Sequence, residues 1–346
     1  MKATLVLALL ALAPAARGMQ NLTGTTAAQF LTLGVGARSL GMGEAYMAVA
    51  DGADAAYWNP GGLAVLTRPE LAYSRSELGV GLHEDFAAVA VPSQLLHGTM
   101  ALAVTRLSQD SMALVDNQDN ADNPGLGSFS PHSEVYALAY GTRLAGDNGK
   151  RSQPDAFRDD WGAPAMARLP AEAEDAPAGV LAAGASVKLI EESLGTRQAS
   201  AFAVDGGALF RPQGLPELTL AGVFRNIGSK ERFIADSEPL PGELGGSAAY
   251  EARAGYWRVI SALEADVPYA GNPYGKIGFE VSRRMGAVVS AALRLGYSSR
   301  MAPDLGLLAG LSAGVGLRIG HFSFDGAFQE AGALGESFRL GVGWRF

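Results

Sequence analysis

The chain has 346 residues, no cysteine, and 27 Lys and Arg against 35 Asp and Glu, a formal charge of −8 at pH 7. This acidic balance excludes the basic footprint of a nucleic-acid-binding protein, and the missing cysteines exclude disulfides and cysteine-ligated metal sites. Mean hydropathy is +0.11, yet beyond the first twenty residues no apolar run reaches the ~18 residues of a transmembrane helix.

Residues 1–18 are predicted to be a secretory signal peptide. Lys2 gives a positive start, an apolar run broken only by Thr4 follows, and Pro14 leads into small residues up to Gly18. The apolar core is too short to cross a bilayer. The pattern predicts Sec-type export, with cleavage after Ala15 or Gly18.

Residues 19–66 do not alternate cleanly and are predicted to form short helical turns. Asp51 is a candidate helix cap. Asn59 precedes Pro60, which disfavours helix at that point and ends the turn. The glycine-rich stretch 34–43 lacks the spacing of a phosphate-binding loop, so no nucleotide site is predicted.

The rest of the chain alternates with period 2, as half-buried strands do. The last stretch is the clearest: Phe338, Leu340, Val342, Trp344 and Phe346 share one face, with Arg or Gly between most of them. Fourteen such segments are predicted, an even number, as in single-chain outer-membrane barrels. They cover residues 70–77, 85–91, 99–107, 133–144, 179–193, 199–211, 217–228, 244–253, 257–267, 276–282, 289–297, 311–319, 322–329 and 338–346.

These segments predict an all-β, antiparallel transmembrane barrel. The lengths of the loops between them predict which side of the membrane each end of the barrel faces. If the barrel begins and ends in the periplasm, the long connections near 108–132 and 229–242 face outside, and short turns face the periplasm. One connection departs from this rule. The insertion at about 145–178 is rich in Pro, Ala and charge and falls on the periplasmic side, either as a flexible spacer or as a docking segment for a periplasmic partner.

Several motifs resemble the PorV/PorQ family, part of the wider FadL-like group of outer-membrane barrels. They are Ala28-Gln29-Phe30-Leu31, Gly34 to Arg38, Gly41-Met42-Gly43, Ala48 to Asp51, Tyr57-Trp58-Asn59-Pro60 and shorter matches up to Arg345-Phe346. Gly61 departs from the family, which usually has Ala there. The resemblance implies a fourteen-stranded barrel over residues 67–346, with residues 19–66 folded into the lumen as a hatch.

On this resemblance, the hatch residues expected to have structural or gating roles are Arg38, Gly41, Gly43, Asp51, Asp54, Trp58, Asn59, Pro60 and Gly61. The predicted lumen face carries charges of both signs, among them Arg258, Glu264, Lys276, Glu280, Arg294 and Arg318. Unpaired charges in a narrow lumen are costly. We therefore interpret them as a paired network that holds the hatch rather than as a selectivity filter, with Arg38 expected to pair with Glu264 or Glu280.

Trp344 and Phe346 have two interpretations. They are lipid-facing aromatic residues by position, and they fit the C-terminal signal that the barrel-assembly machinery reads before insertion into the outer membrane. Both can hold for the same side chains.

The sequence offers little for chemistry. The four histidines show no metal-ligand spacing, and no G-x-S-x-G elbow occurs, so no enzyme, cofactor or metal site is expected. The resemblance favours a secretion-associated outer-membrane protein that binds or shuttles exported cargo with secretion-system components. The alternatives are a FadL-like conduit for hydrophobic small molecules such as fatty acids, and a structural surface barrel.

Overall fold

A computed structural model describes residues 26–113, 127–146, 179–194, 197–232, 237–306, 308–330 and 336–346. The predicted signal peptide and most of the predicted insertion, residues 147–178, lie outside the described residues. None of the helices in the described ranges is long and apolar enough to cross a membrane.

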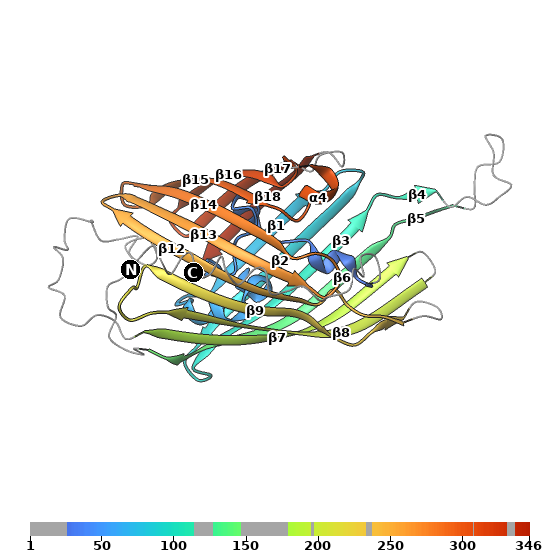
Figure 1. Ribbon diagram of the computed structural model, residues 1–346, viewed down its shortest axis with the longest axis horizontal. Coiled ribbons are helices and arrows are strands. Elements are labelled where there is room, and N and C mark those ends of the chain that lie inside the picture. The colour runs from blue at the N-terminus through green and yellow to red at the C-terminus, as the bar shows by residue number, and fades with distance from the viewer. Residues whose placement is uncertain are drawn as a thin grey trace.

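Fourteen antiparallel strands close into a single barrel, which confirms the predicted fold class and strand number (Figure 1). Each strand pairs with its neighbour along the chain, and β1 closes the ring on β18. The barrel strands are β1 (Glu70–Glu77), β2 (Leu82–Ser93), β3 (Gly98–Gln109), β6 (His132–Ala145), β7 (Val180–Leu194), β8 (Arg197–Arg211), β9 (Leu218–Gly228), β12 (Glu243–Ala254), β13 (Trp257–Pro268), β14 (Tyr274–Met285), β15 (Val289–Ser298), β16 (Leu311–Ile319), β17 (Phe322–Glu330) and β18 (Glu336–Arg345).

The two ends of the barrel differ. Short elements occupy the end we call the loop end: the pair β4 (Met112–Ala113) and β5 (Ser128–Phe129), the pair β10 (Glu231–Arg232) and β11 (Ser237–Glu238), and α4 (Ala302–Leu305). At the opposite end, which we call the terminal end, β1 begins, β18 ends and Phe346 donates its N–H to Pro69. The helix α4 and the four short strands were not predicted, because two to four residues carry no readable period.

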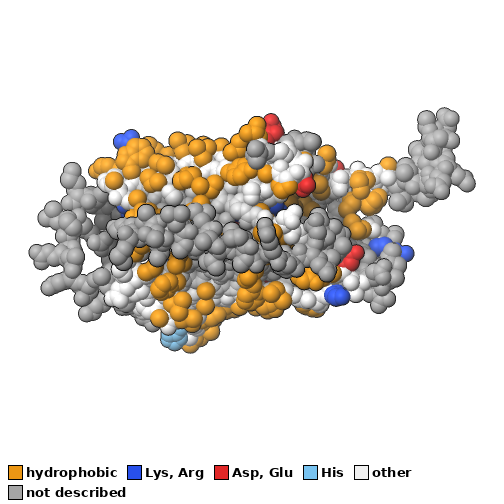
Figure 2. Space-filling view, viewed as in Figure 1, with side chains coloured by type: hydrophobic (Ala, Val, Ile, Leu, Met, Phe, Trp, Pro, Cys, Tyr) orange, Lys and Arg blue, Asp and Glu red, His pale blue; other side chains and the backbone are white. Residues whose placement is uncertain are grey.

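The strands sort their side chains by period 2, as predicted. On β18, Leu340 faces outward with 55% of its surface exposed, while the neighbouring Arg339 faces the lumen and is 2% exposed. Outward positions are mostly large and apolar, and they gather along the side of the barrel (Figure 2). An outer wall of this kind is stable in lipid, where a mid-membrane Arg or Lys costs about 2–4 kcal/mol.

Residues 26–66, called the hatch from here on, lie inside the barrel. The hatch contains η2 (Gln29–Thr32), α2 (Ala37–Gly41), α3 (Ala55–Trp58) and η3 (Pro60–Val65). It starts at the loop end, where Ala27 donates its N–H to Pro239, and runs to Glu70 at the terminal end. Its own side chains make the centre of the molecule, because Tyr46, Met42, Trp58 and Leu63 are at most 1% exposed.

The helical-turn cap expected at Asp51 stays a prediction. α3 itself begins after Asp54, whose side chain makes no capping hydrogen bond, and Asp51 pairs with Arg38. The capping role falls to Asn59, whose side chain accepts the N–H of Gly61 at the start of η3.

Candidate functional site

The hatch backbone rests on glycines of the wall at β6, β7 and β8. A Cβ at Gly141 or Gly184 would collide with the carbonyl of Pro60, and one at Gly207 would collide with the side-chain oxygen of Asn59. Asn59 also donates to the carbonyl oxygens of Met47, at 3.0 Å, and Ala208, at 3.3 Å. The Asn59-Pro60 motif therefore links two parts of the hatch to each other. It also links the hatch to the wall at positions where the wall residues are glycines.

A second contact of the same kind lies across the lumen. There the hatch backbone at Met42 and Gly43 occupies the space that a Cβ at Gly278 or Gly296 would need. Gly43 has a φ of +62°, a conformation that side chains disfavour. These wall strands, β14 and β15, are separated from β6–β8 by β9, β12 and β13 on one side of the ring. The hatch therefore bridges the lumen.

Arg38 is the charged link between the hatch and the wall. Its guanidinium donates to both oxygens of Glu280, at 2.8 and 3.0 Å, and to Asp51 at 3.0 Å. Glu280 is one of the two partners expected for Arg38 from the sequence. It is also bound by Arg294 at 2.7 Å, and Arg294 extends the network to Asp325. Two-point guanidinium–carboxylate contacts fix geometry as well as charge.

Glu264, the other wall carboxylate expected to meet the hatch, accepts backbone N–H groups instead of Arg38. It binds the amides of Tyr46 and Met47 at 3.0 and 2.9 Å and the ammonium of Lys276 at 2.8 Å. Lys276 also lies 5.6 Å from the centre of the Trp58 ring, and Arg225 lies 5.4 Å from it. Trp58 is thus held between two cations, and its indole N–H donates to the carbonyl of Val35 at 3.0 Å.

The remaining predicted residues are dispersed. Arg258 contacts Glu251 at 2.7 Å and Glu280 at 3.8 Å, and Arg318 lies on the lumen face near the terminal end of β16. Trp344 and Phe346 lie outside the lumen, where their rings meet edge to face at 4.1 Å and Phe322 stacks on Trp344. The gating and assembly roles expected for these groups stay predictions.

Asp54 is a titratable group inside the hatch. Burial raises the pKa of Asp54 to about 7, and the nearby carboxylates Glu70 and Asp51 add to that rise. A carboxyl group with such a pKa holds its proton in mildly acidic solution and loses it near neutrality.

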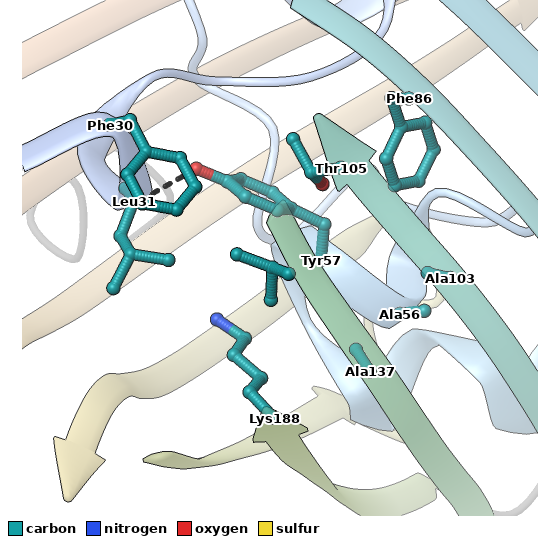
Figure 3. Close-up of a pocket in the computed structure, with 10 residues that line it drawn as sticks. Phe30, Leu31, Ala56, Tyr57, Phe86, Ala103, Thr105, Ala137 and Lys188 are labelled. Atoms are coloured by element: carbon teal, nitrogen blue, oxygen red, sulfur yellow. Dashed lines mark hydrogen bonds between the residues drawn. The ribbon is translucent and has the colours of Figure 1, made fainter. Parts of the chain in front are cut away.

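A small apolar cavity lies between the hatch and the wall in the half of the barrel nearer the loop end (Figure 3). Tyr57 crosses it and donates its hydroxyl to the carbonyl of Leu31 at 3.1 Å. The cavity holds about 20 Å³, room for about one water molecule. Its lining comprises Phe30, Leu31, Ala56, Tyr57, Phe86, Ala103, Thr105, Val135, Ala137 and Lys188.

Lys188 brings one charge to this apolar lining. Its ammonium lies 2.6 Å from Asp205 and 2.9 Å from the side-chain oxygen of Asn226. Asn226 has a φ of +58°, at the point where the register between β8 and β9 shifts. At this bulge, Asp205 balances the charge of Lys188 and Asn226 accepts a hydrogen bond from it.

A second cavity of the same size adjoins the first and is polar. It shares Leu31 and Tyr57 with the apolar cavity, and its other lining includes Glu44, Arg225, Glu243, Tyr274, Lys276 and Arg300. The sequence predicted neither cavity. It also did not predict that Tyr57 and Lys188 would line the same cavity. Alternation places Lys188 in the lumen, but the pairing depends on how the hatch folds, which strand periodicity does not show.

The fold and this arrangement define a β-barrel whose lumen is closed by its own N-terminal segment. No protein-family model matches the sequence, and no curated protein matches it. Solved structures do share the fold. The toluene transporter TodX of Pseudomonas putida matches with a TM-score of 0.53 at 9% identity, and a FadL homologue of Pseudomonas aeruginosa with 0.51 at 9%. Each match covers 90% of this chain and 98% of the other. The chain thus has the FadL-like barrel fold.

Proposed function

We propose that this protein is an outer-membrane conduit for hydrophobic small molecules. The observation that supports this proposal is the apolar cavity at Tyr57, which lies between the hatch and the wall of the barrel. Ligand sites of this kind are concave, mostly apolar and provided with a few polar groups, here Tyr57, Thr105 and Lys188. The shared fold with TodX and the FadL homologue, a toluene transporter and a FadL relative by name, supports the same class of cargo.

This proposal also assigns the two ends of the barrel. After Sec-type export and loss of residues 1–18, the terminal end would face the periplasm and the loop end the outside. Short connections then lie inside and longer ones outside, the usual order in outer-membrane barrels. A hydrophobic molecule would enter near the loop end, and passage would require the hatch to move, because both cavities hold only about one water.

The test compares uptake of labelled toluene and a labelled long-chain fatty acid by a deletion strain carrying each variant. Ala137→Leu places a larger side chain in the apolar cavity, and we expect uptake to fall about tenfold, which is about 1.4 kcal/mol. Leu138→Phe is the matched control, since Leu138 faces lipid on the same strand. Equal uptake by the deletion strain and wild type would contradict the proposal.

The secretion function suggested by the PorV/PorQ resemblance receives no support from the comparisons. It makes a distinct prediction that the same strain tests: exported proteins should fail to reach the cell surface. Retention of exported proteins together with normal uptake of both labelled compounds would favour secretion over transport.

A further inference from the structure

The apolar cavity and the polar cavity meet at Leu31 and Tyr57, which line both. The ring of Tyr57 crosses the apolar side, and its hydroxyl points to the carbonyl of Leu31 (Figure 3). The polar side carries charged groups from the hatch, from β9, β12 and β14, and from the segment after β15. A molecule that occupied both cavities would therefore need an apolar body and a polar head.

Most charged groups of the polar cavity already have partners in the wall. Glu243 accepts hydrogen bonds from Arg225 at 2.6 Å and from the hydroxyl of Tyr274 at 2.5 Å. The ammonium of Lys276 lies 2.8 Å from Glu264. These contacts commit the charges of Glu243, Arg225 and Lys276 to the protein itself.

Glu44 differs from the other carboxylates around this cavity. In the described part of the chain, its partly buried side chain forms neither a hydrogen bond nor an ion pair. Its backbone has a φ of +61°, a left-handed conformation that is costly for a glutamate and is often kept at functional positions. A Cβ at Gly34 would collide with the Glu44 carboxylate, so a glycine makes room for it. The fold therefore presents a free hydrogen-bond acceptor to the polar cavity.

Arg300 brings a hydrogen-bond donor to the same cavity. Its guanidinium donates to the carbonyl of Thr32 at 2.5 Å and lies 5.7 Å from the centre of the Tyr274 ring. A guanidinium has five N–H groups, so this contact leaves others for a ligand. Both described side chains, Arg300 and Glu44, line the cavity without pairing with each other.

The two signs of charge around the cavity disfavour an ionic head group. An anion that reached Arg300 would lie near Glu44, and a cation that reached Glu44 would lie near Arg300, because the cavity holds only about one water molecule. An ion that leaves water without a matching partner carries a large desolvation penalty. A hydroxyl is neutral and can both donate and accept a hydrogen bond, so it can satisfy both side chains.

We propose that Glu44 and Arg300 form a head-group site for the hydroxyl of an amphipathic alcohol, whose apolar body extends past Tyr57 into the apolar cavity. This inference rests on the transport function proposed above and narrows the cargo to hydrophobic molecules with a neutral hydroxyl. Glu44 accepts the hydrogen bond of the hydroxyl, and Arg300 donates to its oxygen. An analogue without the hydroxyl leaves the buried carboxylate without a partner, which is the basis of strong discrimination.

Uptake of three labelled compounds of equal chain length, dodecanol, dodecanoate and dodecane, tests the site in the deletion strain carrying each variant. After the uptake of the deletion strain itself is subtracted, wild type should take up dodecanol about tenfold faster than either other compound. Glu44→Gln keeps the shape of the side chain and removes its charge. The ratio of dodecanol to dodecanoate uptake should therefore fall about tenfold. The matched control is Glu191→Gln, because Glu191 is exposed on the outer face of β7.

The outcomes separate this site from the transport function. Equal uptake of dodecanol and dodecane by wild type would overturn the head-group site and leave transport in place. An unchanged ratio in Glu44→Gln, or the same fall in Glu191→Gln, would contradict the role of Glu44. If none of the compounds enters faster than in the deletion strain, transport and this site fail together. If Glu44→Gln does not assemble, the wild-type ratios decide, and dodecanoate taken up as fast as dodecanol contradicts the site.

Discussion

At the residue scale, the hatch is fixed by charge at Arg38. This side chain binds Glu280 at two points and Asp51 at one, with 15% of its own surface exposed. Removing one partner of a buried ion pair costs about 3–5 kcal/mol, mostly because the other charge remains buried. Glu280 retains Arg294 at 2.7 Å, so the wall should survive the loss of Arg38 better than the hatch does.

Arg38→Ala should therefore loosen the hatch without unfolding the barrel. We expect higher conductance in planar bilayers and an unchanged shift between folded and heat-denatured bands on gels, with the docking of the hatch weakened by about 3 kcal/mol. Arg75→Ala is the control, because Arg75 forms its ion pairs on the exposed outer face. Conductance equal to wild type would show that the other contacts between hatch and wall hold the hatch without Arg38.

Asp54 makes the docking of the hatch depend on pH. Its folded-state pKa is raised to about 7 from an ordinary value of 3.8, so between these values the folded state binds the proton and the unfolded state does not. Stability therefore falls as pH rises from about 4 to 7, by at most about 1.4 kcal/mol per pH unit, and is level above that. Conductance or proteolysis of the hatch, compared at pH 5 and pH 7.5, should show looser docking at the higher pH.

Asp54→Asn should reduce this pH dependence, because the amide does not titrate in this range. Comparing the variant with wild type subtracts the titration of every other carboxyl group. An identical pH response in both proteins would assign the effect to other groups.

At the element scale, strands were predictable and hatch contacts were not. The predicted bounds of β1 agree with the structure at both ends, because Leu71 and Tyr73 alternate with small or polar residues. Arg38 was singled out through the family resemblance, and its partner was narrowed to two carboxylates. The sequence could not predict which wall glycines contact the hatch backbone. Gly184 and Gly246 look alike in the sequence, and only the folded path of the hatch distinguishes them.

The difference between Gly184 and Gly246 gives a test of the contact between the hatch and strands β6–β8. Gly184→Val would drive a side chain into Pro60, an overpacking that costs about 1–3 kcal/mol, so the turn at Asn59 should shift and protease should cleave the hatch faster. Gly246→Val is the control, since a Cβ there meets nothing within 4 Å and faces outward on β12. Equal cleavage rates would mean that the wall gives way instead of the hatch.

At the scale of the whole molecule, closure is a property of the hatch and not of the wall. Small eight-stranded barrels are filled by their own side chains, while barrels of 16–18 strands leave an aqueous channel. With fourteen strands, this lumen needs added material, and residues 26–66 provide it with Trp58, Tyr46 and Met42 at the centre.

Deletion of residues 26–66 should accordingly convert the closed barrel into a water-filled pore. We expect steady conductance several times that of Arg38→Ala, because the deletion removes the hatch together with all its contacts at β6–β8 and β14–β15. Lumen charges now bound to the hatch, Glu264 and Glu280 among them, would then face water. Water solvates these charges, so they no longer carry the desolvation penalty of a dry interior. The measurement is single-channel conductance of refolded barrel, with heat-modifiability as the check on folding. Conductance as low as that of the intact protein would mean that inward side chains collapse into the vacated lumen and that closure belongs to the wall after all.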